Sequence, residues 1–395
     1  MKAKIFSILP FLFGLFFFSA CGHLMNKSSA VFISDQEPFN QQIQIPPNVR
    51  ILEIHHDGGN VTVKGWDKPF LLIEGIKRVS AANAEEARLL LDSAQIIYYE
   101  RAPNRLALEY KGISARKKNA PSEAIDYTIN APQSLIVEMT TRNGVISVSN
   151  LLTDVFIDHK TGDVKVEAVE GRVRIQSQDG QAIAVRTKKS VELDCRDANI
   201  KLDAIGGDVS IKHWNGQLVA AGIGGNVEIA GDRSSIDLQK VKGRLKIDNR
   251  DGDVVCTDFY EGIDINVKKG LLKLEPKIPV PRDYYCTVVD GELILRVLDS
   301  SEMLLEVEAE NGRIHSDYPM PISAENNISF ARGAINGGHR NVRLKVKNGA
   351  VSIQKAIVPP AAISEPAAKA PAQAPSTAVP APLTPGGLVP AKVAP

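Results

Sequence analysis

Charged side chains recur at a fixed interval in the middle of this chain, and acidic and basic groups at one spacing can perform acid–base chemistry. One set, the charged row, is spaced 18 positions apart and consists of Arg174, Glu192, Ser210, Glu228, Lys246 and Asp264. If this interval is one coil of a stacked β structure, these side chains lie above one another on one face. Each carboxylate then has a basic neighbour, as in a cross-strand ladder. The pattern favours a structural role, and we predict no catalytic residues.

A second set with the same spacing suggests a contact surface. This alternating row consists of Lys165, Ile183, Lys201, Val219, Asp237, Val255 and Lys273. Every second member is apolar, and a contiguous exposed apolar patch marks a contact site. Ile183, Val219 and Val255 are therefore our candidates for a partner-binding face. The alternative is that this face is covered within the molecule, for instance by a helix that begins near Asn83.

Two motifs resemble metal ligands. Gly-Asp pairs, as in calcium-binding turns, occur at Gly162-Asp163, Gly207-Asp208 and Gly252-Asp253. The complete Gly/Asp nonapeptide of calcium β-rolls is absent, so these pairs favour simple turn chemistry. His55 and His56 are adjacent, and adjacent side chains on a strand point to opposite faces. We therefore predict no metal site and no cofactor.

The N-terminus predicts export and lipid attachment. Lys2 and Lys4 precede an apolar run from residue 5 to 18, which is typical of a secretory signal peptide. Phe18-Ser19-Ala20-Cys21 resembles the bacterial lipobox, which implies cleavage before Cys21 and acylation of its sulfur. The alternative is an ordinary signal peptide with an incidental cysteine. We expect a membrane partner through Cys21 and an envelope location. Gly22, and not an aspartate, follows the cysteine, which in a Gram-negative cell resembles sorting to the outer membrane.

Composition excludes several other classes of protein. The formal net charge of +1 gives no electrostatic footprint for nucleic acid. Phosphate-loop, dinucleotide and Gly-x-Ser-x-Gly motifs are absent from the sequence. Cys195 and Cys256 fall at inward positions of alternating runs and read as small buried apolar residues. A Cys256–Cys286 disulfide stays open as an alternative.

Turn-forming residues divide the central sequence into equal lengths. One series comprises Gly144, Gly162, Gly180, Asn199, Gly216, Ser235, Gly252 and Gly270. A second series lies midway and comprises Gly171, Ser190, Gly207, Gly225, Gly243 and Gly262. Short alternating runs such as Val173-Arg174-Ile175 follow these turns, so each coil holds two strands with apolar residues inward. The sequence predicts an all-β fold, a parallel β-solenoid or β-helix of two-strand coils.

Changes in pattern along the chain predict its organisation. We expect a signal peptide at 1–20, a tether at 21–44, a β-rich cap at 45–134, the solenoid at 135–356 and a disordered Pro/Ala-rich tail at 357–395. The cap carries a hairpin formed by two runs, 51–54 and 61–63. It also carries one short helix near 84–94, with Asn83 as N-cap and Glu86 completing a capping box. The spacing widens to 21 positions between Gly291 and Gly312, so the later coils are expected to be larger or to carry loops.

Several repeats resemble a known group of proteins. The runs Asn143–Val148, Gly162–Val166 and Gly171–Ile175 resemble the bacterial adhesin-like family of unknown function. The segment Gly59–Asp67 is similar to the N-terminal region of that family, and Lys347–Ile353 is similar to its closing motif. The resemblance spans residues 45 to 354 and implies a repetitive β-solenoid surface or periplasmic protein without assigned catalytic residues.

The combined features predict a non-enzymatic, lipid-anchored envelope protein, periplasmic or surface-exposed, that presents a solenoid surface to an envelope protein or a glycan. One alternative is a carbohydrate-active β-helix enzyme resembling polysaccharide lyases, and another is a structural envelope-stress component. A cleft lined by three or more acidic and basic side chains on one face favours the enzyme. A flat, ladder-like face favours the binding protein.

Overall fold

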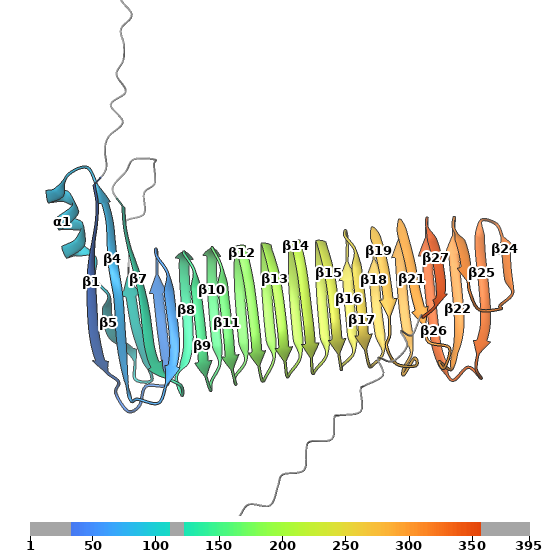
Figure 1. Ribbon diagram of the computed structural model, residues 1–395, viewed down its shortest axis with the longest axis horizontal. Helices are drawn as coiled ribbons and strands as arrows, with labels where there is room; N and C mark the ends of the chain where they lie inside the picture. Colours follow the sequence, from blue (N-terminus) through green and yellow to red (C-terminus); the bar gives the residue numbers. More distant parts are fainter. Residues whose placement is uncertain (1–32, 111–121, 357–395) are drawn as a thin grey trace, which may run out of the picture. The chain divides into compact units, whose positions relative to one another are not determined.

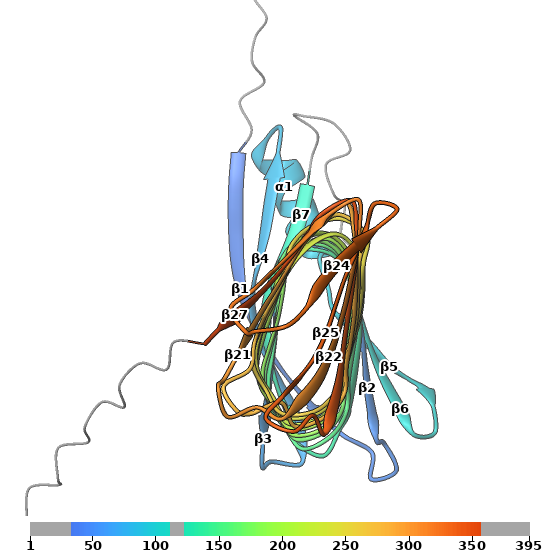
Figure 2. The ribbon, with the colours of Figure 1, turned by 90° about the vertical axis from the view of Figure 1, so that its right-hand side faces the viewer.

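The computed structural model describes residues 33–110 and 122–356, and the chain divides into two compact units, 1–355 and 356–395. The predicted signal peptide, Cys21 and the predicted tail at 357–395 lie outside the described residues. All described strands and the described helix belong to the first unit. Its strands stand side by side along a stack (Figure 1) and superpose as a flattened oval when viewed along that stack (Figure 2). The predicted parallel β-solenoid is confirmed.

The regular coils are built from strands with a constant parallel register. These strands are β8 (Ile136–Asn143), β9 (Ile146–Leu151), β10 (Val155–Thr161), β11 (Val164–Val169), β12 (Val173–Thr187), β13 (Val191–Ile205), β14 (Val209–Ile223), β15 (Val227–Val241), β16 (Leu245–Asn249), β17 (Val254–Phe259), β18 (Ile263–Val267), β19 (Gly270–Glu275), β20 (Tyr284–Val289) and β21 (Gly291–Val297). Val173 pairs with Val191, and Val191 with Val209, so paired strands are offset by 18 positions. Strands β12 to β15 continue around one corner, so each forms most of a coil.

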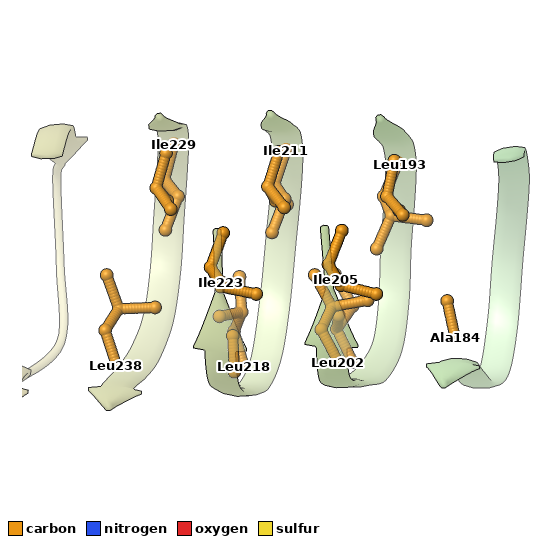
Figure 3. Close-up of a cluster of buried hydrophobic side chains, with 14 of the residues drawn as sticks. Ala184, Leu193, Leu202, Ile205, Ile211, Leu218, Ile223, Ile229 and Leu238 are labelled. Carbon is orange, nitrogen blue, oxygen red and sulfur yellow. The ribbon is translucent and has the colours of Figure 1, made fainter. Parts of the chain in front are cut away.

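Aliphatic side chains stack in columns between the two sheet faces. Leu193, Ile211 and Ile229 lie above one another in β13, β14 and β15 (Figure 3), and each is at most 2% exposed. Leu202 and Leu238 belong to the facing column. Burial of one such side chain contributes about 1.5–3 kcal/mol, so the repeated columns hold the coils together.

The two corners of a coil use glycine for different reasons. Gly162 in the first series has a φ of 124°, a conformation that favours glycine. A Cβ at Gly162 would also lie 2.0 Å from the backbone oxygen of Gly144. At Gly171 in the second series, lack of space is the only reason, because a Cβ there would lie 2.2 Å from the backbone of Thr153. A further set of positive-φ positions recurs once per coil from β9 to β17 and consists of Asn150, Ala168, Arg186, Ala204, Gly222, Lys240 and Asp258. Most of this third set is not glycine, which hid it from the sequence pattern.

The aspartates of the Gly-Asp pairs form hydrogen bonds between the corners of successive coils. Three aspartates each accept the backbone N–H of the residue 18 positions later: Asp163 from Gln181 at 3.0 Å, Asp208 from Asn226 at 2.7 Å and Asp253 from Leu271 at 2.9 Å. Their carboxylates therefore tie one corner to the next.

The N-terminal boundary of the solenoid differs from the prediction. β2 (Ile51–His56) and β3 (Val61–Trp66) pair with β8 and β9, not with each other, so the predicted hairpin is wrong. They form the two sides of the first coil, because the turn at Gly59 is a coil corner that stacks beneath Gly144. Five described elements follow this coil in the sequence before β8 begins: β4 (Phe70–Ala81), α1 (Ala84–Ser93), β5 (Ile97–Ala102), β6 (Arg105–Tyr110) and β7 (Ser122–Pro132).

The predicted tether is a strand over its second half. β1 (Ile33–Gln44) pairs antiparallel with β4 along its whole length. The strand is polar because it lies at the edge of the sheet and is mostly exposed. That polarity made residues 33–44 resemble a linker.

The predicted helix and its N-cap are confirmed. Asn83 Oδ1 accepts the Glu86 backbone N–H at 2.8 Å. The Glu86 carboxylate accepts the backbone N–H of Ala82 at 2.9 Å, one residue before the position expected of a capping box. Ala87 and Leu91 bury against β4, so α1 covers part of the cap.

At the C-terminal end the order of the coils in space differs from their order in sequence. The last strands are β22 (Met303–Glu310), β23 (Arg313–Ser316), β24 (Ile322–Glu325), β25 (Ile328–Ile335), β26 (Arg340–Lys347) and β27 (Ala350–Lys355). β26 and β27 lie between the β20/β21 coil and the β22/β23 coil. Gly291 therefore stacks on Gly349 and not on Gly312. The expected larger coil is confirmed between Gly270 and Gly291, which pair at an interval of 21 positions. After Gly291 the expectation is wrong, because β22 and β23 leave one level of the stack empty and β26 and β27 later occupy it.

Candidate functional site

The charged row forms a continuous ladder on one face. Its members lie in register in consecutive strands from β12 to β18. Arg174 Nε is 3.7 Å from Glu192 Oε1, and Lys246 Nζ is 2.8 Å from Glu228 Oε1. Hydrogen bonding to Glu228 raises the pKa of Lys246. Because solvent surrounds both pairs, they set register and stabilise the fold only weakly.

The alternating row points outward on the other sheet. Its members follow one another in register from β11 to β19. Ile183, Val219 and Val255 are each half-buried. α1 packs against β4 and β1, so the prediction that the helix near Asn83 covers this row is wrong. Partner binding at these three residues stays a prediction.

A charged cluster lies at the N-terminal end of the face that carries the charged row. The buried Glu53 carboxylate is 2.7 Å from His55 Nε2 and accepts hydrogen bonds from Arg101 and from Arg105, the latter at 3.3 Å. Burial raises the pKa of Glu53, but these cationic and hydrogen-bonding neighbours outweigh it and hold the pKa below its usual value. Glu53 is therefore an ionised member of a salt-bridge network and not a free acid.

The prediction that His55 and His56 point to opposite faces is confirmed. His55 is half-buried on the outer face, whereas His56 is 1% exposed in the core. Sequence reasoning missed the column to which His56 belongs. The same interior position in consecutive coils is occupied by His56, Thr141, His159, Ser177, Cys195 and His213. His159 and His213 are separated by a whole number of coils, three, and that spacing is the signal that reveals the column.

The buried histidines of this column are held neutral. Burial lowers the pKa of His56 to about 4, although hydrogen bonding to the Gly59 backbone and the carboxylates of Asp126 and Asp57 partly offset it. Burial also lowers the pKa values of His159 and His213. Protonation in the folded state is therefore costly.

A groove near the C-terminal end gathers aromatic and charged side chains from four strands. We call it the C-terminal groove; its volume is about 470 Å³, and its side chains include Tyr285, Glu306, Glu308, Phe330, Arg332, Arg343 and Lys345. β26 and β22 lie between β20, which carries Tyr285, and β25, which carries Phe330. The two aromatic side chains therefore stand on opposite sides of a charged floor. Tyr285 is 38% exposed and Phe330 is 43% exposed.

Ion pairs organise the floor of the groove. Glu306 lies 2.9 Å from Arg343 Nε and 3.4 Å from Arg332 Nη2. The Arg343 guanidinium carbon is 5.9 Å from the centre of the Tyr285 ring. Lys345 Nζ is 2.8 Å from Glu308, and this hydrogen bond raises the pKa of Lys345. The groove thus presents planar donors, carboxylate acceptors and two ring faces.

The described part of the chain holds no group of three or more His, Cys, Asp or Glu side chains placed to bind a metal ion. No helix in this part is long and apolar enough to cross a membrane. Cys195, Cys256 and Cys286 are buried and free, so the Cys256–Cys286 disulfide is not formed. Burial raises the pKa of Cys195 to about 12, which keeps this thiol protonated.

Comparison with known proteins identifies relatives of the solenoid. Residues 190–354 match the family model described as Toastrack DUF4097. No curated protein gives a significant match to this sequence.

Solved structures of low sequence identity are also similar. A putative adhesin from Bacteroides fragilis is 14% identical, covers 81% of this chain and 97% of its own, and gives a TM-score of 0.23. A putative adhesin from Parabacteroides merdae is 10% identical, covers 65% and 95%, and gives 0.30. A putative cell adhesion protein from Clostridium sporogenes is 11% identical, covers 81% and 100%, and gives 0.19.

The matched segment runs from the corner between β12 and β13 through the last strand, and so includes most of the regular coils and the C-terminal groove. The predicted resemblance to the adhesin-like family of unknown function is confirmed over this segment, because residues 190–354 match the Toastrack DUF4097 model.

Proposed function

We propose that this chain is a non-enzymatic, lipid-anchored envelope protein that binds a segment of glycan in its C-terminal groove. The observation that supports it is the placement of Tyr285 and Phe330 on either side of an ionic floor. Sugar rings offer C–H faces that pack on aromatic rings, and their hydroxyls bond to guanidinium and carboxylate groups. Arg332, Arg343 and Lys345 outnumber Glu306 and Glu308, so neutral and acidic sugars fit better than basic ones.

Glycan binding is tested with the full chain. A glycan array should give a small set of ligands, and replacement of either Tyr285 or Phe330 by Ala should weaken binding about tenfold, since one ring contact contributes about 1.4 kcal/mol. Tyr260→Ala is the matched control, because Tyr260 is also 38% exposed but lies outside the groove. Equal binding by all three variants would show that the groove is not the site.

The second candidate is a carbohydrate-active enzyme in the same groove. Its floor meets the condition set by the sequence, since it holds more than three acidic and basic side chains. However, Glu306 is paired with two arginines and Glu308 with a protonated Lys345, so the observed arrangement offers no unpaired base in the floor. Product analysis separates the two candidates, because any cleavage of the bound glycan would establish catalysis.

The proposed anchor depends on Cys21. We expect fatty-acid labelling of the wild-type chain and its recovery in the envelope fraction. Cys21→Ala should abolish labelling and leave the precursor unprocessed. If this variant is processed normally and stays membrane-bound to the same extent, the lipid anchor is wrong. A chain that binds no glycan but is needed for envelope integrity would instead favour the structural alternative.

A further inference from the structure

Beside the alternating row lies a second outward row on the same sheet face. This neighbouring row consists of Glu167, Val185, Asp203, Ala221, Gln239, Thr257 and Glu275, each two positions after a member of the alternating row. Its members follow one another in register through the same strands. Where the alternating row is lysine, the neighbouring row is acidic at three levels: Lys165 with Glu167, Lys201 with Asp203 and Lys273 with Glu275. Where the first is Ile183 or Val219, the second is Val185 or Ala221.

We propose that this face docks against the same face of a second copy of the chain, with both stacks pointing the same way. A two-fold axis along the stack, between the two rows, places each residue of one row opposite the other row of the second copy in the same coil. Lys201 then faces Asp203 and Asp203 faces Lys201. Ile183 faces Val185, and Val219 faces Ala221. This complementarity points to a second copy of the chain as the binding partner, because each lysine level meets an acidic side chain and these two apolar levels meet apolar side chains.

The opposite orientation fits less well. A two-fold axis along the strands reverses one stack and places Lys165 opposite Lys273 and Glu167 opposite Glu275. These are like charges, which disfavour association. The same-direction arrangement also leaves the N-terminal ends of both copies on one side, which suits two chains anchored in one membrane.

The second of the three lysine levels, Lys201 with Asp203, is the most sensitive to mutation. Lys165 and Lys273 already have partners on their own strands, with Nζ 2.7 Å from Glu167 and 3.0 Å from Glu275. In contrast, Lys201 and Asp203 are exposed and form no ion pair among the described residues. The strip is seven coils long, roughly 29 Å at about 4.8 Å per coil, and it is narrow. We therefore expect a weak, concentration-dependent dimer.

The charge test uses sedimentation of the full chain as isolated from cells. Lys201→Asp should raise the dimer dissociation constant roughly tenfold, because the two-fold axis creates two Asp–Asp contacts. The swap Lys201→Asp/Asp203→Lys should restore it to within about threefold, because the face stays self-complementary. Lys212→Asp, an equal charge change on the opposite sheet, should have no effect.

Orientation is tested by cross-linking of Ile183→Cys with a short bismaleimide. In the proposed pair both positions lie in one coil and should cross-link, whereas in a reversed pair they are four coils, roughly 19 Å, apart along the stack. A reversed pair would cross-link only when Ile183→Cys is mixed with Val255→Cys. Cross-linking only in this mixture would overturn the proposal, and so would a chain that stays monomeric at all concentrations. The proposal is also wrong if Lys201→Asp leaves dimerisation unchanged, or if the swapped variant dimerises as weakly as Lys201→Asp.

Discussion

The neutral, buried His56 should make the first coil sensitive to acid. Its pKa is about 4 in the folded chain, against an ordinary value of 6.5. Below pH 6.5 the unfolded chain binds a proton that the folded chain excludes, so the free energy of unfolding falls as the pH drops towards 4 and levels off below it. A difference of 2.5 pH units corresponds to about 3 kcal/mol in total. About 2 kcal/mol of this is lost between pH 7.5 and pH 5.

The variant His56→Phe removes the titrating group while keeping a ring against Tyr110 and Tyr127, whose ring centres lie 5.2 Å and 5.0 Å from that of His56. Urea unfolding is followed through the fluorescence of Trp66, which lies in the same coil, in a Trp214→Phe background. For this variant, the loss of unfolding free energy between pH 7.5 and pH 5, as reported by Trp66, should be smaller than in the wild type by about 2 kcal/mol. His56→Phe should therefore be the more stable chain at pH 5.

The control is His315→Phe, because the side chain of His315 is 74% exposed. This variant should keep the acid sensitivity of the wild-type chain. The reasoning is refuted if His56→Phe loses stability with acid as steeply as the wild type, since the proton uptake would then lie elsewhere. His159 and His213 add a further acid-sensitive contribution in later coils, which His56→Phe leaves in place.

Three further predictions concern the coil corners and the core. Ala168 has a φ of 55°, so Ala168→Gly should raise the free energy of unfolding by about 0.5 kcal/mol. Ala184 lies buried in a strand, so Ala184→Gly should lower it by about 1 kcal/mol. Equal losses of stability for the two variants in urea unfolding would contradict this. Asp208→Ala leaves the Asn226 N–H without its acceptor and should cost about 1 kcal/mol, while EDTA or calcium should not move the melting temperature of the wild type; a calcium-dependent shift would restore the calcium interpretation. Leu193→Ala should cost about 3 kcal/mol by opening a cavity in the stacked core, and a loss below about 1 kcal/mol in the same assay would show that the coils close around it.

The regular coils were predictable because each repeats one simple rule. Alternation places Leu193 and Ile211 inward, and the constant interval aligns Arg174 with Glu192. The core column and the charged row therefore both follow from counting positions in the sequence. The third set of positive-φ positions escaped this reasoning because residues such as Ala168 and Arg186 adopt positive φ without being glycine. The surrounding sheet register imposes that conformation, and the local sequence carries no sign of it.

The two ends of the solenoid were harder to predict, since their pairings join residues far apart in sequence. Ile51 pairs with Ile136 across the whole cap, and a turn such as that at Gly59 serves a hairpin and a coil corner equally well. The C-terminal groove was missed for the same reason. Tyr285 meets Arg343 only because β26 returns to the level beside β20. No interval in the sequence indicates that return.

Glycan binding at the C-terminal groove is the central claim, and calorimetric titration of the full chain with its best array ligand tests it most directly, with product analysis of the same sample. We expect saturable binding, an intact ligand afterwards, and affinity about tenfold lower for Tyr285→Ala and for Phe330→Ala but unchanged for Tyr260→Ala. Cleavage of the ligand would contradict the non-enzymatic function. Undiminished affinity in both groove variants would contradict the site.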